Sequence, residues 1–306
     1  MKKNEQNMAD ETTQKAFASR GLTRRSFMAG VASAAMALTL FVGCGGAPAA
    51  TNEGSAAGSA AATSKDTSAV ATGKLIVGFD QSYPPYGYVG DDGEYTGFDL
   101  DLARAVAEEQ GWELELEAID WDAKDAMLKS GAINCIWNGF TMDNREDDYT
   151  FSDPYMLNAQ VVVVRADSDI EDAEGLAGKT VVTQVDSAAE AVLKEDAADL
   201  AATFASLETI GDYNTAFMQL ESGAVDAVAC DLSIAMYQMT AKPDAYVMLD
   251  DYLSEENYAV GFKKGDTATA KKVTETLKAL YEDGTVDEIA AKYADQGLTM
   301  DNWQIK

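Results

Sequence analysis

Arg145 is the residue of this sequence that is best placed to bind an anion. The stretch Leu128–Tyr155, LKSGAINCIWNGFTMDNREDDYTFSDPY, predicts a helix end, a Ser-Gly turn, an apolar strand from Ile133 to Trp137 and a polar loop from Asn138 to Arg145. Ligand sites of open α/β sheets lie beyond the carboxyl ends of the strands, so this loop is a candidate binding loop. The planar fork of Arg145 matches a carboxylate better than a lysine does. The alternative interpretation is a solvated surface arginine.

The composition excludes several kinds of chemistry. The 306 residues contain no histidine, which removes Ser-His-Asp and Cys-His mechanisms, histidine acid-base catalysis and histidine-containing metal sites. The net charge of -29 comes from 52 acidic and 23 basic residues. Such a charge argues against nucleic acid or an anionic bilayer as a partner. We expect no cofactor, no metal site and no catalytic residue.

Two halves of the sequence repeat the same order of elements. LKSGAINCIW at Leu128–Trp137 is echoed by LESGAVDAVA at Leu220–Ala229, and GKLIVGFDQS at Gly73–Ser82 is echoed by GKTVVTQVDS at Gly178–Ser187. The repeat predicts two similar α/β lobes, and a cleft between such lobes is the default ligand site. The alternative is that these short matches are coincidental turn chemistry.

Residues 1–44 have the pattern of an export signal. The basic region ends in TRRSFM at Thr23–Met28, a twin-arginine pattern, and an Ala-rich apolar run follows. The run is too short to span a bilayer, which needs roughly 20 residues. FVGC at Phe41–Cys44 looks like a lipobox, with Phe41 in place of the usual leucine, and so predicts a lipid anchor on Cys44 at the outer face of the bacterial cytoplasmic membrane. The alternative is that Cys44 is a small residue near a peptidase site.

The remaining chain divides into a tether and two lobes. Residues 45–72 are rich in Ala, Gly and Ser and predict a flexible tether. We assign residues 73–163 and 258–306 to lobe 1 and residues 164–257 to lobe 2, with crossings near Val161–Arg165 and Tyr258–Phe262. Cys135 and Cys230 each lie in an apolar strand and are expected to be buried and unpaired, although an exported protein leaves a disulfide open.

Local patterns place further elements beside the cleft. An apolar strand that begins at Lys74 places the segment Asp80–Tyr86 beside the cleft, and a helix that begins after Gly97 ends at Gly111. Ser187-Ala-Ala-Glu190 is a capping-box pattern that opens a helix in the second half. Helices over 267–281 and 286–293 are expected to pack on lobe 1.

The order of these motifs resembles a known family. DQSYPPYGY, GFDLDLARAVAEEQG, DWDAKDAMLKSGAINCIWNGFT, the arginine and FSDPY occur in the order found in extracytoplasmic amino-acid-binding proteins of ABC importers, the polar amino acid family (family 3) of solute-binding proteins. The resemblance runs from Lys74 to about Gly297. It implies the type II periplasmic-binding-protein fold, with two Rossmann-like α/β lobes joined by two crossing strands. It also implies a monomer that captures a free amino acid and delivers it to a membrane permease, without catalysis.

The resemblance implies a role for particular residues of lobe 1. Arg145 occupies the place of the arginine that holds the ligand α-carboxylate, and the loop before it supplies further contacts. Tyr83 matches an aromatic that packs over the ligand, Trp121 an apolar contact and Asp80 an aspartate near the side-chain pocket. The loop contacts carry over to Asn138, Gly139 and Thr141. The segment from Thr141 to Arg145 is one residue shorter than the common loop, which puts the register of Asn138 and Gly139 in doubt.

In lobe 2 the resemblance implies that Asp231 takes the ligand ammonium and that Ser187 and backbone amides contact the carboxylate. Ala188 and Ala189 depart from the polar residues usual there. Other interpretations remain open: Asp231 as a helix cap, Tyr83 and Trp121 as core aromatics, and Asp80 as a turn residue.

Two other classes of function also remain open. An enzyme on the same fold, of the dehydratase kind, would have to use Asp80 or Asp186 as its acid or base. A ligand-sensing module is disfavoured, because no membrane segment follows Lys306. The sequence leaves open whether the amino acid has a polar, cationic or apolar side chain.

Overall fold

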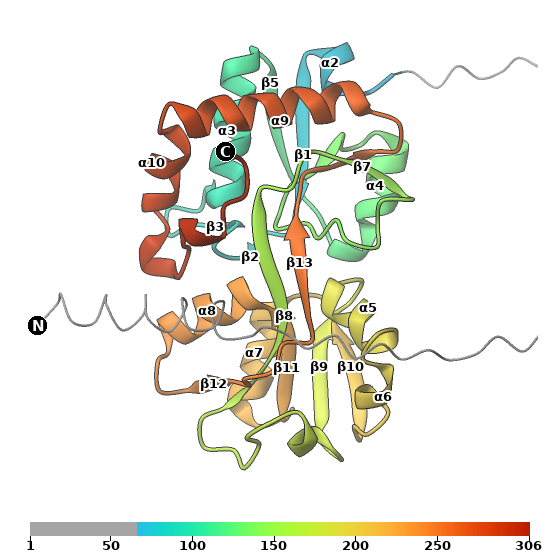
Figure 1. Ribbon diagram of the computed structural model, residues 1–306, viewed down its shortest axis with the longest axis vertical. Coiled ribbons are helices and arrows are strands. Elements are labelled where there is room, and N and C mark those ends of the chain that lie inside the picture. The colour runs from blue at the N-terminus through green and yellow to red at the C-terminus, as the bar shows by residue number, and fades with distance from the viewer. Residues whose placement is uncertain (1–65) are drawn as a thin grey trace, which may run out of the picture. The chain divides into compact units, whose positions relative to one another are not determined.

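The computed structural model describes residues 66–306, which fall within one compact unit. The predicted export signal at residues 1–44, the predicted lipidation site Cys44 and most of the predicted tether lie outside the described residues. The described chain forms two α/β lobes joined by two strands (Figure 1).

Lobe 1 is built on a five-stranded sheet. Its strands in spatial order are β5 (Glu113–Ala118), β1 (Lys74–Phe79), β6 (Cys135–Ile136), β14 (Gly261–Lys263) and β7 (Tyr149–Phe151). Strands β5 and β6 pair parallel to β1, and β14 pairs antiparallel to both β6 and β7. A small antiparallel sheet of β2 (Ser82–Tyr83), β3 (Gly87–Val89) and β4 (Tyr95–Thr96) follows β1.

Helices surround this sheet. They are α2 (Ala69–Thr72), α3 (Phe98–Gln110), α4 (Lys124–Ser130), α9 (Thr267–Glu282) and α10 (Thr285–Ala291), with short 3₁₀ turns at Trp121–Ala123, Ala294–Gln296 and Met300–Asn302. The predicted bounds of α3 are confirmed: Gly97 precedes it and Gly111 ends it in the left-handed conformation. A Cβ on Gly97 would lie 2.2 Å from the Tyr86 carbonyl oxygen, so this helix start requires glycine. As expected, α9 packs on α3 of lobe 1.

The sheet of lobe 2 has its strands in an order equivalent to that of lobe 1. Its strands are β10 (Ser206–Ile210), β9 (Thr180–Gln184), β11 (Ala227–Asp231), β8 (Met156–Arg165) and β12 (Tyr246–Met248), and β13 (Ser254–Tyr258) also pairs with β8. Its helices are α5 (Ala188–Lys194), α6 (Ala198–Ala201), α7 (Tyr213–Ser222) and α8 (Leu232–Ala241), with a 3₁₀ turn at Glu174–Leu176.

The internal repeat corresponds to equivalent elements. The echoed Gly-Lys segments form β1 and β9, and the echoed Ser-Gly segments end α4 and α7 before β6 and β11. Gly131 and Gly223, which close these helices, have φ of 81° and 75°. Because β1 neighbours β6 and β9 neighbours β11, the repeats reflect two similar lobes rather than coincidental turns.

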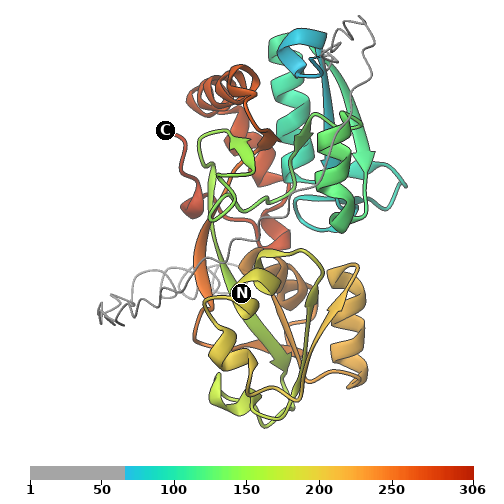
Figure 2. The same cartoon turned by 90° about the vertical axis from the view of Figure 1, so that its right-hand side faces the viewer.

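Two adjacent strands connect the lobes. Residues Met156 to Gln160 of β8 pair antiparallel with Tyr258 to Ser254 of β13, and the two strands run side by side between the lobes (Figures 1 and 2). Two crossings were expected, but both connecting strands begin earlier than predicted, at Met156 instead of Val161 and at Ser254 instead of Tyr258. Val161 to Val164 already pair with β11 inside the lobe 2 sheet, so residues 161–163 do not belong to lobe 1. The continuous apolar run hid the boundary, because every residue in it suits a buried strand.

The predicted tether also ends earlier than expected. Ala69–Thr72 form α2, where Ser68 caps the helix and Gly73 ends it in the left-handed conformation. The Asn134 side chain donates to the Thr67 carbonyl oxygen at 3.2 Å. These contacts attach residues 67–72 to lobe 1, which low apolar content alone did not predict.

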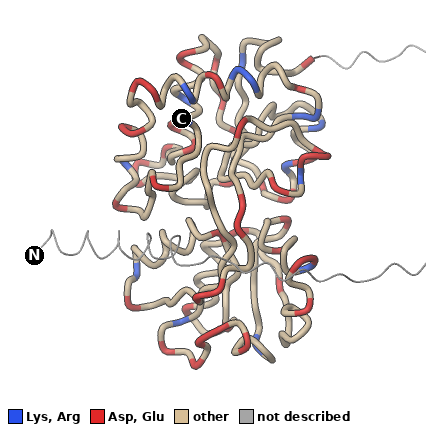
Figure 3. The backbone as a smooth tube through the Cα atoms, viewed as in Figure 1, with Lys and Arg blue, Asp and Glu red and all other residues tan. Residues whose placement is uncertain are grey.

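Each lobe has its own apolar core. Val162, Leu176 and Val181 are among the buried residues of lobe 2, and Ile133, Ile136 and Phe140 among those of lobe 1. Cys135 and Cys230 are buried and unpaired, as expected. Asp and Glu residues occur along the backbone of both lobes (Figure 3).

Candidate functional site

A small cavity lies between the lobes, with a volume of about 10 Å³. It is lined by Tyr83, Trp121, Asn138, Gly139, Thr141, Arg145, Gln184, Ser187, Ala188 and Asp231. Of the nine site residues predicted from the sequence, only Asp80 is missing from this lining. Residues up to Arg145 come from lobe 1, and the last four come from lobe 2. A volume of this size holds about one water molecule, so side chains from the two lobes nearly fill the space.

The loop after β6 delivers Arg145 to this cavity. One guanidinium nitrogen, Nη1, donates to the Thr141 carbonyl oxygen at 3.2 Å, and Nη2 donates to the Asp186 carbonyl oxygen of lobe 2 at 3.4 Å. The guanidinium carbon lies 4.8 Å from the centre of the Phe140 ring. Among residues 66–306, no carboxylate forms an ion pair with Arg145. Its positive charge is thus available to an anion in the cavity.

Buried polar contacts fix the loop that precedes Arg145. The Gly139 N–H donates to Asp99 Oδ2 at 2.6 Å, and the Asn138 Oδ1 accepts from the Asp80 N–H at 2.7 Å. Burial raises the pKa of Asp99 to about 7, while the hydrogen bond from Tyr155 has the opposite effect. Gly139 has a φ of 56°, which favours glycine. This loop is therefore held from within lobe 1.

Asp231 is a lobe 2 residue that lines the same cavity. Its Oδ1 accepts from the Tyr258 hydroxyl at 2.8 Å, from Gln160 Nε2 at 2.7 Å and from Asn158 Nδ2 at 3.1 Å. The residue precedes α8, but its side chain makes no capping hydrogen bond there. The interpretation of Asp231 as a mere helix cap is therefore wrong. It is a buried carboxylate held by three donors, and such an acceptor suits an ammonium group.

Glu256 is a second buried carboxylate beside Asp231. Its Oε1 accepts from the same two amides, Asn158 Nδ2 and Gln160 Nε2, both at 2.7 Å. Burial, together with the negative charge of Asp231, raises the pKa of Glu256 to about 8, while the hydrogen bonds from Asn158 and Gln160 act in the opposite direction. Glu256 and both amides were not predicted from the sequence. The available signal was the spacing of Asn158 and Gln160, two polar residues two positions apart in an otherwise apolar strand.

Asp80 lies behind the cavity rather than on its wall. Its Oδ1 accepts from the Ser82 N–H at 2.7 Å, and its Oδ2 accepts from Gln184 Nε2 of lobe 2 at 2.7 Å. Burial raises the pKa of Asp80, hydrogen bonds from Ser82 and Gln184 act against this, and the charges of Asp212 and Asp120 raise it. The residue both satisfies a turn and bridges the lobes.

The start of α5 forms the lobe 2 wall. The Ser187 hydroxyl oxygen accepts from the Glu190 N–H at 3.1 Å, as the predicted capping box requires. The return contact differs, because Glu190 Oε2 accepts from the Asp186 N–H at 2.6 Å instead of from Ser187. Ser187 and Ala188 both line the cavity.

Tyr83 and Trp121 are at once packed aromatics and cavity walls. The Tyr83 hydroxyl lies 3.2 Å from the Tyr258 hydroxyl, and Trp121 Nε1 donates to the Asp186 carbonyl oxygen at 3.2 Å. The Trp121 ring packs edge-on against Phe140 at 5.7 Å between ring centres. The core interpretation and the ligand-contact interpretation are therefore compatible for both residues.

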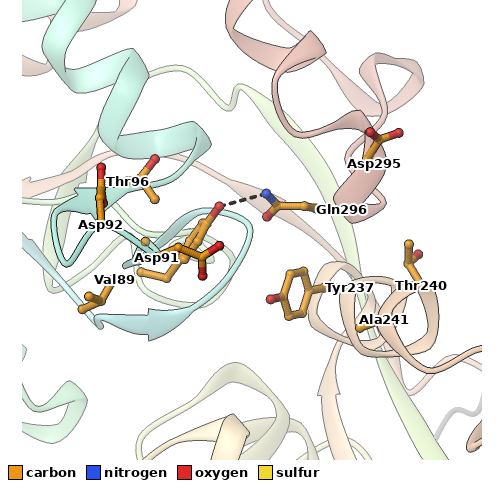
Figure 4. Close-up of a pocket in the computed structure, with 11 residues that line it drawn as sticks. Val89, Asp91, Asp92, Thr96, Tyr237, Thr240, Ala241, Asp295 and Gln296 are labelled. Atoms are coloured by element: carbon orange, nitrogen blue, oxygen red, sulfur yellow. Dashed lines mark hydrogen bonds between the residues drawn. The ribbon is translucent and has the colours of Figure 1, made fainter.

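A larger cavity of about 670 Å³ lies elsewhere and contains none of the predicted site residues. Asp91 and Asp92, after β3, line one side, and Tyr237 and Thr240 of α8 line another (Figure 4). Asp295 is on its wall as well, and no basic side chain lines it. This acidic cavity lacks a partner for a carboxylate.

Other kinds of site are not found in the described chain. Between residues 66 and 306, no group of three or more Cys, Asp or Glu side chains is arranged to hold a metal ion. In the same range, no helix combines the length and the apolar character needed to cross a membrane.

Two α/β lobes joined by two strands, with a polar cavity between them, define the class of type II periplasmic-type solute-binding proteins. The chain matches the model of the bacterial extracellular solute-binding proteins, family 3, over residues 75–296. It therefore belongs to this family.

Individual relatives agree with that assignment. The L-cystine-binding protein TcyJ of Escherichia coli (strain K12) is 28% identical over 230 residues, which cover 74% of this chain and 85% of that protein. A probable histidine-binding protein of Neisseria gonorrhoeae is 30% identical over 241 residues, covering 75% and 87%. The crystal structure of an ABC uptake transporter substrate binding protein from Streptococcus pneumoniae with bound histidine has a TM-score of 0.71 and 34% identity, covering 75% of this chain and 95% of that one.

Proposed function

We propose that this protein captures a free α-amino acid between its lobes and delivers it to the permease of an ABC importer. The observation that carries the proposal is that Arg145 of lobe 1 and Asp231 of lobe 2 line one cavity. The two side chains carry opposite charges, as do the carboxylate and the ammonium of an amino acid. A zwitterion pairs both, whereas a ligand that lacks one charge leaves either the half-buried Arg145 or the buried Asp231 unpaired. For the buried carboxylate this costs several kcal/mol.

Binding in this proposal is coupled to lobe closure about β8 and β13. The cavity of about 10 Å³ leaves no room for an amino acid, so the lobes open to admit one and close with the ligand between them. The ligand stabilises the closed form because only that form offers both charges together. The relatives named for cystine and histidine support an amino acid as the ligand.

The proposal includes no catalytic step. Asp80, one of the two acids that an enzyme would have to use, is outside the cavity lining and has both oxygens engaged by donors. The other, Asp186, has a side chain that is 54% exposed. An exposed carboxyl lacks the apolar surroundings that tune a catalytic acid.

We also propose that the mature protein is a monomer held to the outer face of the cytoplasmic membrane by lipid on Cys44. The pattern FVGC supports this part, together with the exported character of the family. Replacement Cys44→Ala is expected to release the protein from the membrane fraction, and mass spectrometry of the mature N-terminus tests for the lipid directly.

The function is tested by a thermal-shift panel of the common amino acids on the mature protein. A ligand at about 100 times its dissociation constant stabilises the folded state by roughly 2.7 kcal/mol, which raises the melting temperature measurably. We expect a small set of related amino acids to do so. No shift with any amino acid at millimolar concentration contradicts the proposal.

A further inference from the structure

Three donors of lobe 1 converge on one backbone oxygen of lobe 2. The Asp186 carbonyl oxygen accepts from Trp121 Nε1 at 3.2 Å, from Lys124 Nζ at 3.4 Å and from Arg145 Nη2 at 3.4 Å. Two of the three donors are cations. Because both lie 3.4 Å from one oxygen, the ammonium and the guanidinium nitrogen are at most twice that distance apart.

Lys124 is an unusual residue to find in this position. The residue is 3% exposed, and lysine is rarely buried to this degree. Its other acceptors are the Trp121 carbonyl oxygen at 3.3 Å and Asp186 Oδ2 at 3.4 Å. Burial lowers the pKa of Lys124, the Asp186 charge raises it, and the Arg145 charge lowers it. The positive charges of Lys124 and Arg145 therefore oppose each other in the closed cleft.

Two carboxylates oppose the positive charge of Lys124: Asp186 within ion-pair distance, and Asp125 of the same helix, which acts on it without forming an ion pair. The Asp186 carboxylate is the only one that pairs with Lys124 among the described residues, and its side chain is 54% exposed. Water screens an exposed carboxylate, so it offsets only part of the positive charge. The Asp186 backbone itself is fixed, since its φ is 57° and its N–H donates to Glu190 Oε2 at 2.6 Å.

We infer that Lys124 is a specificity-determining residue, a second cation behind the carboxylate end of the cavity that makes closure favour a carboxylate ligand over a neutral one. Lys124 does not line the cavity, so it acts through its charge and through the Asp186 peptide that it shares with Arg145. An anion beside Arg145 relieves the repulsion between the two cations, whereas a neutral group leaves it in place. The inference rests on the proposed function.

The test compares an amino acid with its own carboxamide, which keeps the ammonium and the side chain but has no negative charge. The measured quantity is the dissociation constant of the carboxamide divided by that of the amino acid, both determined by calorimetry at one ionic strength. This ratio isolates the contribution of the carboxylate charge. Lys124→Met is expected to reduce this ratio by between about threefold and fiftyfold. That range is the interaction of the Lys124 charge with a ligand carboxylate taken to lie about 7 Å away, on the order of the separation between Lys124 and Arg145, at effective dielectric constants of about 80 to 20.

Matched variants separate charge from packing. Lys129→Met removes an exposed lysine of the same helix and is expected to leave the ratio unchanged. Lys124→Gln removes the charge but keeps a donor for the Asp186 carbonyl, and it should lower the ratio as Lys124→Met does. It replaces Lys124→Met in the test if that variant fails to fold. Asp186→Asn keeps the carbonyl, removes the partly offsetting negative charge, and should raise the ratio.

Each outcome has one meaning. If Lys124→Met and Lys124→Gln weaken the binding of the amino acid and of its carboxamide by the same factor, Lys124 has a merely structural role and the inference is overturned. If the unaltered protein binds no amino acid, the proposed function fails instead. A lowered ratio in both Lys124 variants, with the opposite change in Asp186→Asn, supports the inference.

Discussion

Asp231 and Glu256 are two buried carboxylates that share one pair of amide donors. They lie on strands on either side of β8, where Asp231 is opposite Gln160 and Glu256 is opposite Asn158. Each amide nitrogen donates to both carboxylates. Like charges held this close oppose each other, and burial together with the charge of Asp231 raises the pKa of Glu256.

This arrangement predicts a pH dependence of stability. The pKa of Glu256 is raised in the folded state from 4.5 to about 8, so its contribution is fully present below pH 4.5 and is lost as the pH rises towards 8. Glu256→Gln removes the titrating group. Between pH 4.5 and 8 the free energy of unfolding of this variant should therefore fall less steeply than that of the unaltered protein, with slopes that differ by on the order of 1 kcal/mol per pH unit. Chemical denaturation at several pH values measures the difference. Identical slopes for the two proteins would show that Glu256 does not titrate there.

The ammonium end of the cavity is tested with Asp231→Asn. The change removes the charge while keeping the size, so ligands with a free α-amino group should bind at least about thirtyfold more weakly, as expected for loss of one partner of a buried charge pair. Binding of an N-acetylated analogue should change far less. Asp244→Asn, at an exposed position of lobe 2, is the control. Equal losses for the two ligands would refute the assignment of Asp231 to the ammonium.

The backbone of the binding loop is tested with Gly139→Ala. A Cβ there would lie 3.0 Å from ring carbons of Tyr83 and Tyr258, in addition to the strain of a positive φ. Gly93→Ala is a matched control, since Gly93 has a φ of 83° and no atom within 4 Å of the added Cβ. Both variants should lose about 1–2 kcal/mol of stability, and only Gly139→Ala should also weaken ligand binding. Unchanged affinity in Gly139→Ala would mean that the two tyrosines move aside without consequence.

Much of the fold follows from local signals in the sequence. Repeated Ser-Gly and Gly-Lys segments identified equivalent helix ends and strands, because glycine is favoured where a helix closes in the left-handed conformation. The crossing of β8 was placed too late because nothing in a run of valines distinguishes a strand that spans two lobes from one that stays in a sheet.

The site was predicted less completely than the fold. The loop that ends in Arg145 and the strand that ends in Asp231 are short segments with polar residues after an apolar strand, so their position at the cavity follows from the topology. Lys124 and Glu256 were not predicted as part of the site, because their burial depends on how the lobes close and on which strands pair. A charged residue on an amphipathic helix or a crossing strand is normally solvated, so its residue type alone gave no signal.

Arg145, as the partner of the ligand carboxylate, is the residue on which amino-acid binding is expected to depend most. Calorimetric titration of Arg145→Ala with the amino acid that stabilises the unaltered protein tests this directly, and Arg104→Ala, a lobe 1 arginine paired with Asp101, is the control. We predict that Arg145→Ala keeps its fold and loses at least about thirtyfold in affinity, the cost of leaving a buried charge unpaired. A dissociation constant equal to that of the unaltered protein would contradict the account.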